Sequence, residues 1–278
     1  MNEPTPISTA MVPIIFTHFP LPYRNPGTRF ERIYPEGKML IESRRGVPYG
    51  KSGRSLVSLI TTQAILQGSR KIELGHVTEA FRRMGQVVSG GKSGTVQRIS
   101  EQFQRFYTTL ISLELRIHKG DGFRAFRGKQ MILAEEMELY WSAKEKDLET
   151  PSLFQNTVTL SQPYFDYVKD HSTPVDLITF HSLQSPLDQD WYAWLSRKLF
   201  VALKSDKESV VPWESLYLQF GLKDPRRKGS EFRKDFADFM VFILTKHPEA
   251  RVKLREDGVS IIPSALIIPE NNKGFVQT

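Results

Sequence analysis

The sequence predicts an α+β protein made of two tandem winged-helix domains, a helix-turn-helix variant, behind an extended N-terminal arm. Two observations support this fold class. The same succession of strand, helix, basic loop, longer amphipathic helix and β-hairpin occurs twice, about 135 residues apart. Basic residues also gather around the longer helix of each copy. Two helices closed by a hairpin, the wing, form a unit whose second helix fits the major groove of DNA.

Length and charge agree with this organisation. The 278 residues are enough for two domains, each with a core of its own. Residues 48–134 hold 14 Lys and Arg against 5 Asp and Glu, whereas residues 135–184 hold 3 against 9. A basic module beside an acidic connector indicates a surface for a polyanion, and a merely solvated basic surface is the alternative.

The composition also excludes several classes of protein. The absence of cysteine excludes disulfides and thiolate metal sites, and it fits a cytoplasmic location. No apolar run approaches the ~20 residues of a membrane span, so a membrane is not an expected partner.

Five segments are expected along the chain. They are an extended Pro-rich arm (1–46), a first winged-helix domain (47–140), an acidic connector with a short strand and helix (141–184), a second winged-helix domain (185–265) and a tail (266–278).

The elements of the first domain follow from apolar spacing and from glycine positions. The long helix has the strongest pattern, because Val96, Ile99 and Phe103 begin an apolar series in steps of three and four. Gly85 is expected to end the shorter helix before it. The expected elements are a helix at Ser52–Gln67, a strand at Lys71–Leu74, a helix at His76–Met84, a loop at Gln86–Ser93, a helix at Gly94–Leu110, and a hairpin of Leu110–Arg116 with Met131–Met137 that turns at Lys119–Gly122.

The second domain is expected to start with a helix at Ser185. Ser at the N-cap, Pro at the first helical position and Asp188 form a capping box, which explains Asp188 without a catalytic role. Trp191 and Trp194 on this helix are expected in the core. The further elements are a strand at Glu208–Val211, a helix at Trp213–Phe220 ended by Gly221, a loop at Leu222–Lys228, a helix at Gly229–Lys246 and a hairpin turning at Glu256–Gly258.

Candidate DNA-binding residues lie on the polar face of each long helix, near its N-terminal end, and on the hairpins. Arg bonds guanine and Gln bonds adenine bidentately, while Ser, Thr and Lys reach phosphates or base edges. Hairpin cations are expected to contact phosphates with little sequence preference. For both helices, a solvated polar face is the alternative. The candidates are Lys92, Ser93, Thr95, Gln97, Arg98, Arg105, Arg124 and Arg127 in the first domain, and Arg226, Arg227, Lys228, Ser230, Arg233, Lys234, Lys253 and Arg255 in the second.

No set of residues indicates catalysis, a metal or a cofactor. Residues 85–93 come close to a phosphate-binding P-loop, but the spacing is one residue too long, and a helix stands where a strand is required. The six His form no metal-binding pair, and the acids Glu135, Glu136 and Glu138 lack a converging partner. We therefore expect no catalytic or metal-binding residues, no cofactor and no enzymatic activity, with a nuclease as the least favoured class.

Several segments together resemble the plasmid-encoded RepA replication-initiator family. They follow one another in the same order as in that family and span residues 47–263, whereas the arm at 1–46 has no counterpart. The segments are Val47–Gly50, Ser52–Gln67, Ser89–Thr95 with Arg98, Pro151–Phe154, Val158–Ser161, Pro174–Leu177, Asp190–Leu195, Val211–Trp213 and Leu218–Gly221.

The resemblance implies an initiator that binds repeated sites, called iterons, in double-stranded DNA at a plasmid origin. It also implies opening of the adjacent AT-rich DNA, recruitment of a host initiator and the replicative helicase, and repression of its own promoter as a homodimer, hence plasmid copy control. A tandem winged-helix transcriptional repressor without initiator activity is the alternative. The residues themselves specify neither the target sequence nor a dimer interface.

Overall fold

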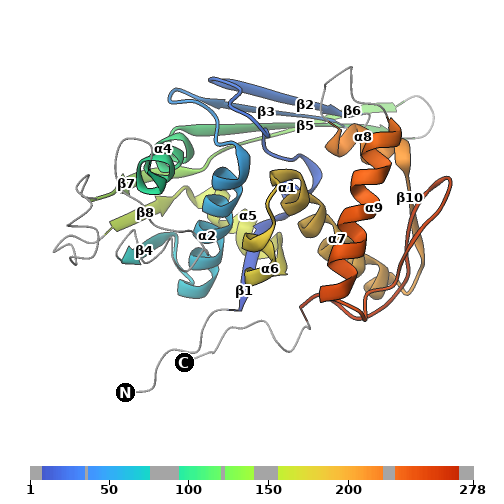
Figure 1. The fold of residues 1–278 in the computed structure, drawn as a ribbon. Helices are drawn as coiled ribbons and strands as arrows, with labels where there is room; N and C mark the ends of the chain where they lie inside the picture. The colour runs from blue at the N-terminus through green and yellow to red at the C-terminus, as the bar shows by residue number, and fades with distance from the viewer. Residues whose placement is uncertain are drawn as a thin grey trace. The chain divides into compact units, whose positions relative to one another are not determined.

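A computed structural model describes residues 8–34, 37–75, 94–119, 123–140, 156–221 and 229–268 (Figure 1). The chain forms two compact units. The central unit is Leu21–Ser172, and the terminal unit joins Met1–Pro20 with Thr173–Thr278. No helix in the described stretches is long and apolar enough to cross a membrane.

The central unit combines two antiparallel sheets with helices. One sheet has the strand order β2-β3-β5-β6 and the other the order β4-β8-β7. The elements are β2 (Arg29–Tyr34), β3 (Gly37–Ser43), α2 (Gly50–Gln67), β4 (Lys71–Gly75), α4 (Thr95–Tyr107), β5 (Thr109–Lys119), β6 (Phe123–Ile132), β7 (Ala134–Glu138), β8 (Asn156–Leu160) and α5 (Gln162–Asp170).

Helix α4 forms where the apolar spacing predicts it. Its apolar positions from Val96 to Phe106 are at most 4% exposed. Phe106 meets Tyr164 of α5 edge to face, with ring centroids 6.2 Å apart. The helix ends at Tyr107, three residues before the expected end, because Leu110 already belongs to β5.

The expected extended arm is wrong for residues 29–43. These residues form β2 and β3, and β3 lies inside its sheet between β2 and β5. Met39 and Ile41 are fully buried, since alternate residues of a strand face the same side. None of the prolines of residues 1–46 stands in β2 or β3, so a proline-rich stretch can still contribute these two strands.

The first hairpin forms as expected, but its return strand begins and ends earlier in the chain than expected. Strands β5 and β6 are antiparallel, with register pairs from Leu110–Ile132 to Lys119–Phe123. The expected partner Met131–Met137 is only partly correct, because β7 leaves this sheet and pairs with β8 in the other one.

The terminal unit is helical around one three-stranded sheet and a two-stranded pair. The sheet orders are β10-β12-β11 and β1-β9. The elements are β1 (Thr9–Pro13), α1 (Ile14–His18), β9 (Ser172–Asp176), α6 (Leu177–Ser182), α7 (Pro186–Ser205), β10 (Ser209–Pro212), α8 (Trp213–Phe220), α9 (Gly229–Lys246), β11 (Val252–Leu254) and β12 (Gly258–Ile261). The bounds of α8 and α9 are those predicted from the sequence.

The predicted capping of α7 is confirmed. The Ser185 hydroxyl accepts a hydrogen bond from the Leu187 N–H at 3.1 Å, and Pro186 occupies the first turn. Asp188, in the same turn, accepts a hydrogen bond from the backbone N–H of Ser185, so its carboxylate helps to cap the start of the helix.

An aromatic core holds α9 against α7. Trp191 is 1% exposed and contacts Phe232, Phe236 and Phe239 with centroid distances of 5.6, 5.1 and 5.3 Å. Each such pair contributes roughly 0.5–1.5 kcal/mol beyond the burial of its area. Trp191 and the equally buried Trp194 are core residues, as predicted.

The first described residues of the chain belong to the terminal unit. Strand β1 pairs with β9, and α1 packs against α7. Ile15 and Phe16 are buried, and Gln219 of α8 donates a hydrogen bond to the Thr17 carbonyl at 2.6 Å. Residues 8–20 are therefore a structural part of the terminal unit, which corrects the expected arm for these residues.

Both units show the same order of elements around a three-stranded sheet. In the terminal unit, α7, β10, α8, α9, β11 and β12 follow one another, and β12 is the central strand. In the central unit, α2, β4, α4, β7 and β8 keep this order, and β8 is central. The predicted helix at 76–84 lies outside the described residues. The β5–β6 hairpin is an insertion between α4 and β7.

Candidate nucleic-acid interface

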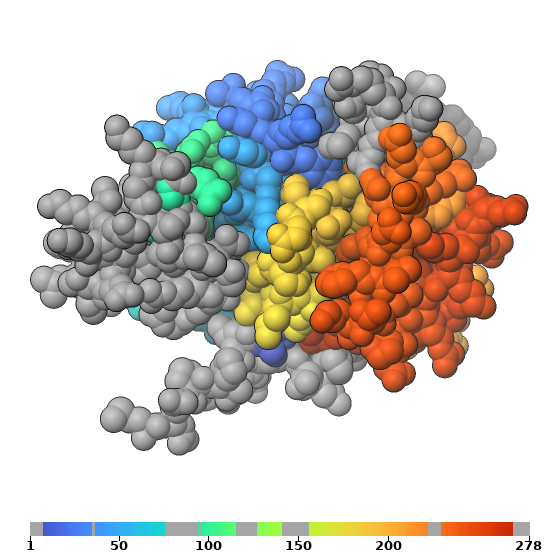
Figure 2. Space-filling model, in the orientation of Figure 1, coloured from blue at the N-terminus to red at the C-terminus, as the bar shows by residue number. Residues whose placement is uncertain are grey.

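Helix α9 presents two chemically different faces. Phe232, Phe236 and Ile243 are at most 1% exposed, whereas Ser230 and Lys234 are exposed. Figure 2 shows α9, in orange, at the surface of its unit. The polar residues lie in the N-terminal half, which is the part of a recognition helix that contacts base edges.

Of the other four candidates near this helix, only Arg233 lies among the described residues. Arg233 is exposed, and its guanidinium lies 5.5 Å from the centroid of the Trp213 ring, a cation–π contact that fixes its direction. The loop with Arg226, Arg227 and Lys228 lies outside the described residues.

The β11–β12 hairpin is attached to the start of α8. The Trp213 indole donates to the Arg255 carbonyl at 2.9 Å, and the Trp213 N–H donates to the Asp257 carbonyl at 3.3 Å. Gly258 lacks a side chain where a Cβ would collide with the Val211 carbonyl of β10. The turn is thereby held against the helix pair.

The two hairpin candidates are not equally available. Lys253 is exposed on β11. Arg255 is also exposed, but its Nε lies 2.9 Å from Asp257 Oδ1 and its Nη1 lies 3.7 Å from Glu208 Oε1. These carboxylates offset the Arg255 charge, so Lys253 is the better candidate for a phosphate contact.

On α4, only the N-terminal half carries candidates on its outer face. Gln97 and Arg98 are exposed there, as predicted. Lys92 and Ser93 lie outside the described residues, and so does the side chain of Thr95.

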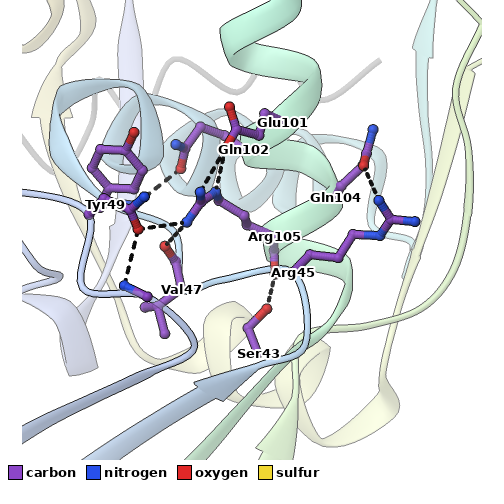
Figure 3. Close-up of polar contacts among 10 residues, drawn as sticks. Ser43, Arg45, Val47, Tyr49, Glu101, Gln102, Gln104 and Arg105 are labelled. Carbon is purple, nitrogen blue, oxygen red and sulfur yellow. Dashed lines mark hydrogen bonds and ion pairs between the residues drawn. The ribbon is translucent and has the colours of Figure 1, made fainter.

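Arg105 was predicted on the outer face of α4, and this placement is wrong. It is 6% exposed, and its Nη1 donates to Asn25 Oδ1 at 3.1 Å and to the Val47 carbonyl at 3.2 Å (Figure 3). Its Nη2 lies 2.7 Å from Glu101 Oε1, and Tyr49 stacks on the guanidinium at 5.0 Å. These contacts occupy the Arg105 guanidinium, so this side chain stabilises the central unit and is not available to bind DNA.

The loop between β3 and α2 is tied to α4 at several further points. Gln102 accepts a hydrogen bond from the Tyr49 N–H at 3.1 Å, and Gln104 accepts one from Arg45 at 2.8 Å (Figure 3). The Ser43 hydroxyl donates to the Arg105 carbonyl at 3.2 Å. These ties fix the position of α4 from its C-terminal half.

One local feature of the sequence does indicate that Arg105 pairs within its own helix. Glu101 stands four residues before Arg105, the spacing at which opposite charges pair on one helix. Another buried arginine, Arg54 on α2, has no such signal. It is 6% exposed and donates to the carbonyls of Leu21 and Pro22, which are distant in sequence.

The candidates on the first hairpin lie on β6, in the sheet β2-β3-β5-β6. Arg127 is exposed on β6, and Arg124 lies on the same strand opposite His118, with its side chain outside the described residues. Lys129, also exposed, lies 5.3 Å from the centroid of the Tyr167 ring. These residues therefore lie on the β5–β6 hairpin, whose sheet also contains β2 and β3.

A histidine at the end of α9 links the terminal unit's stability to pH. His247 Nε2 and the Tyr192 hydroxyl share a hydrogen bond of 2.7 Å. Burial lowers the pKa of His247, and the Asp176 charge acts in the opposite direction. The folded state therefore disfavours protonation, so stability is complete above the ordinary His pKa of about 6.5 and falls as the pH drops below it.

We expect His247→Gln to reduce the loss of stability of the terminal unit between pH 7.5 and 5.5. The measurement is urea unfolding of wild type and variant at both pH values. Part of the pH dependence of the unfolding free energy should remain in the variant, because burial also lowers the pKa of His18. If the unfolding free energy of the variant fell between pH 7.5 and 5.5 by as much as that of the wild type, the role assigned to His247 would be wrong.

Among the described residues, no group of three or more His, Cys, Asp or Glu is arranged to hold a metal ion. Glu135, on β7, instead pairs with Arg70 at 2.5 Å.

The family model described as plasmid-encoded RepA protein matches residues 47–215, which is more than half of the chain. The chain therefore belongs to the plasmid-encoded RepA family, and its role lies in the initiation of plasmid replication. A comparison with curated protein sequences found no match.

The fold is similar to that of domains 2 and 3 of RctB. The crystal structure of selenomethionine derivatives of domain 2 and domain 3 of RctB matches with a TM-score of 0.53 and 12% identity, covering 92% of this chain and 97% of that one. A second structure of RctB domains 2–3 matches with a TM-score of 0.47 and 12% identity, covering 89% and 94%. At this identity the likeness concerns the fold alone.

Proposed function

We propose that the chain is an initiator that binds repeated origin sequences in double-stranded DNA through α9 and α4. The observation that carries this proposal is the division of α9 into a buried aromatic face and an exposed face with Ser230 and Lys234 near its N-terminus. A helix fixed from behind by aromatic packing and polar in front can enter a major groove without losing its own core.

The proposal includes two winged helices in tandem. The order helix, strand, helix, helix, strand, strand, with the last strand central, supports this in the terminal unit. The same order in the central unit supports β7 and β8, and not β5 and β6, as the strands that flank the first wing. Two such modules on one chain would contact successive turns of one duplex.

The work of this initiator would be done by binding energy and not by catalysis. Contacts along repeated sites can support the bending and local opening of adjacent AT-rich DNA. Recruitment of a host initiator and helicase, and repression by a homodimer, belong to the same proposal through family membership. The chain would need no cofactor.

The base-reading role of α9 is tested with Lys234→Ala. We expect this variant to weaken binding to the origin repeats by about 5- to 150-fold, corresponding to roughly 1–3 kcal/mol when one side chain no longer reaches its base. Binding to random duplex should fall much less. Mobility shifts at several salt concentrations measure both.

Lys246→Ala is the matched control, because Lys246 is an exposed lysine at the opposite end of the same helix. It should leave the ratio of specific to random binding unchanged. Equal losses of affinity of Lys234→Ala for both DNAs would contradict base reading by this residue. To separate an initiator from a simple repressor, the gene and its neighbouring repeats are tested for maintenance of a plasmid that cannot otherwise replicate.

A further inference from the structure

A cluster of basic side chains, two of them cations at neutral pH, lies where α1 packs against α7 in the terminal unit. His18 is in the last turn of α1, and Arg197 and Lys198 are adjacent on α7. The charges of Lys198 and Arg197 both act on His18, and that of Arg197 acts on Lys198. Three basic groups from two segments distant in sequence thus share one small region.

This cluster has no counter-charge among the described residues. No Asp or Glu of the described stretches pairs with Arg197 or Lys198, in contrast to Arg105 and Arg255. Both side chains are half-buried, and burial lowers the pKa of Lys198. Half-buried cations side by side are unfavourable unless an anion joins them.

The surroundings hold the cluster in place. Arg197 lies 5.3 Å from the centroid of the Phe200 ring on the same helix, which orients its guanidinium. The hydrogen bond from Gln219 to the Thr17 carbonyl fixes the chain next to His18. The cations are thus positioned before any ligand arrives.

We propose that His18, Arg197 and Lys198 form a phosphate-binding site. Guanidinium, ammonium and imidazole together provide several donors for one phosphate group. The site is separate from the exposed face of α9, since Arg197 lies about 120° around the α7 axis from the core residue Trp191. The phosphate comes either from the backbone of bound DNA, in which case the site extends the proposed function, or from a free nucleotide.

The first experiment uses the full chain and inorganic pyrophosphate. The Tm of the wild type should rise with the logarithm of the pyrophosphate concentration, at ionic strength matched with sodium chloride. The double variant Arg197→Gln/Lys198→Gln should show no such rise, and without pyrophosphate its Tm should equal or exceed that of the wild type. The control Lys207→Gln/Lys246→Gln removes the same charge from exposed positions and should respond like the wild type.

The second experiment identifies the source of the phosphate. If it is the DNA backbone, the double variant should lower the slope of log K against log salt by about one for each phosphate that it no longer binds, equally on repeats and random duplex. If it is a free nucleotide, this slope should not change, and a nucleotide should raise the Tm of the wild type but not of the double variant.

His18→Gln keeps the test decisive if the double variant fails to fold, because it should weaken the pyrophosphate response without removing either α7 cation. Identical responses of wild type, His18→Gln and the double variant to pyrophosphate, duplex and nucleotide would overturn the site. If Lys234→Ala still weakened binding to the origin repeats as expected, that outcome would not contradict DNA recognition by α9.

Discussion

Deletion of residues 1–20 is expected to unfold the terminal unit and to leave the central unit folded. The deletion removes β1, the partner of β9, and exposes the surfaces that bury Ile15 and Phe16. Loss of a buried Phe side chain alone costs about 3–5 kcal/mol, a large part of the stability of a small unit. Calorimetry should then show loss of one unfolding transition, and proteolysis should spare a fragment within 21–172.

The point variant Phe16→Ala separates packing from chain length. It should lower the stability of the terminal unit strongly, whereas Ile178→Ala, an apolar residue of the same unit that is 76% exposed, should change it little. A terminal unit that unfolds at the wild-type temperature after the deletion would refute the role assigned to this segment.

Replacement of Arg105 by Met is expected to destabilise the central unit by about 3 kcal/mol, at the low end for breaking a buried ion pair because Glu101 is half exposed. The donors for Asn25 and Val47 disappear together with the pair. Urea unfolding of the full chain, followed by a probe in the central unit, measures the change. Arg105→Lys should recover little, since an ammonium cannot reproduce the planar fork of the guanidinium.

The control is Arg98→Met, on the exposed side of the same helix. This variant should change the stability by no more than about 0.5 kcal/mol and should lower DNA affinity instead. The opposite result, with Arg105→Met stable but deficient in DNA binding, would restore Arg105 to the interface.

The sequence patterns predicted those elements that local spacing determines. The apolar series from Val96 to Phe106 predicted α4, and the capping residues at Ser185 predicted the start of α7. The bounds of α8 and α9 follow from Pro212, Gly221 and the phenylalanine spacing, which are all local signals. The outer positions of Lys234 and Arg98 followed from the same periodicity.

Features that depend on distant partners were missed. Residues 29–43 form strands because β3 pairs with β5, which lies some 70 positions later in the chain. No local sequence pattern indicates this distant partner. Arg105 was assigned outward because helical geometry alone cannot show that Asn25 and Val47 cover that side. The pairing of β7 with β8 in a second sheet is likewise not visible in the local pattern of residues 131–137.

The separation of β1 from β9 by the whole central unit also has a consequence for protein synthesis. A ribosome delivers residues 21–172 as one continuous stretch, so the central unit can fold while later residues are still being added. Residues 8–20 emerge before the central unit, yet their partners on α7 and α8 emerge only after residues 21–172 have been synthesised. During that interval the apolar side chains of Ile15 and Phe16 lack their packing partners, and they are available for binding by chaperones on the nascent chain.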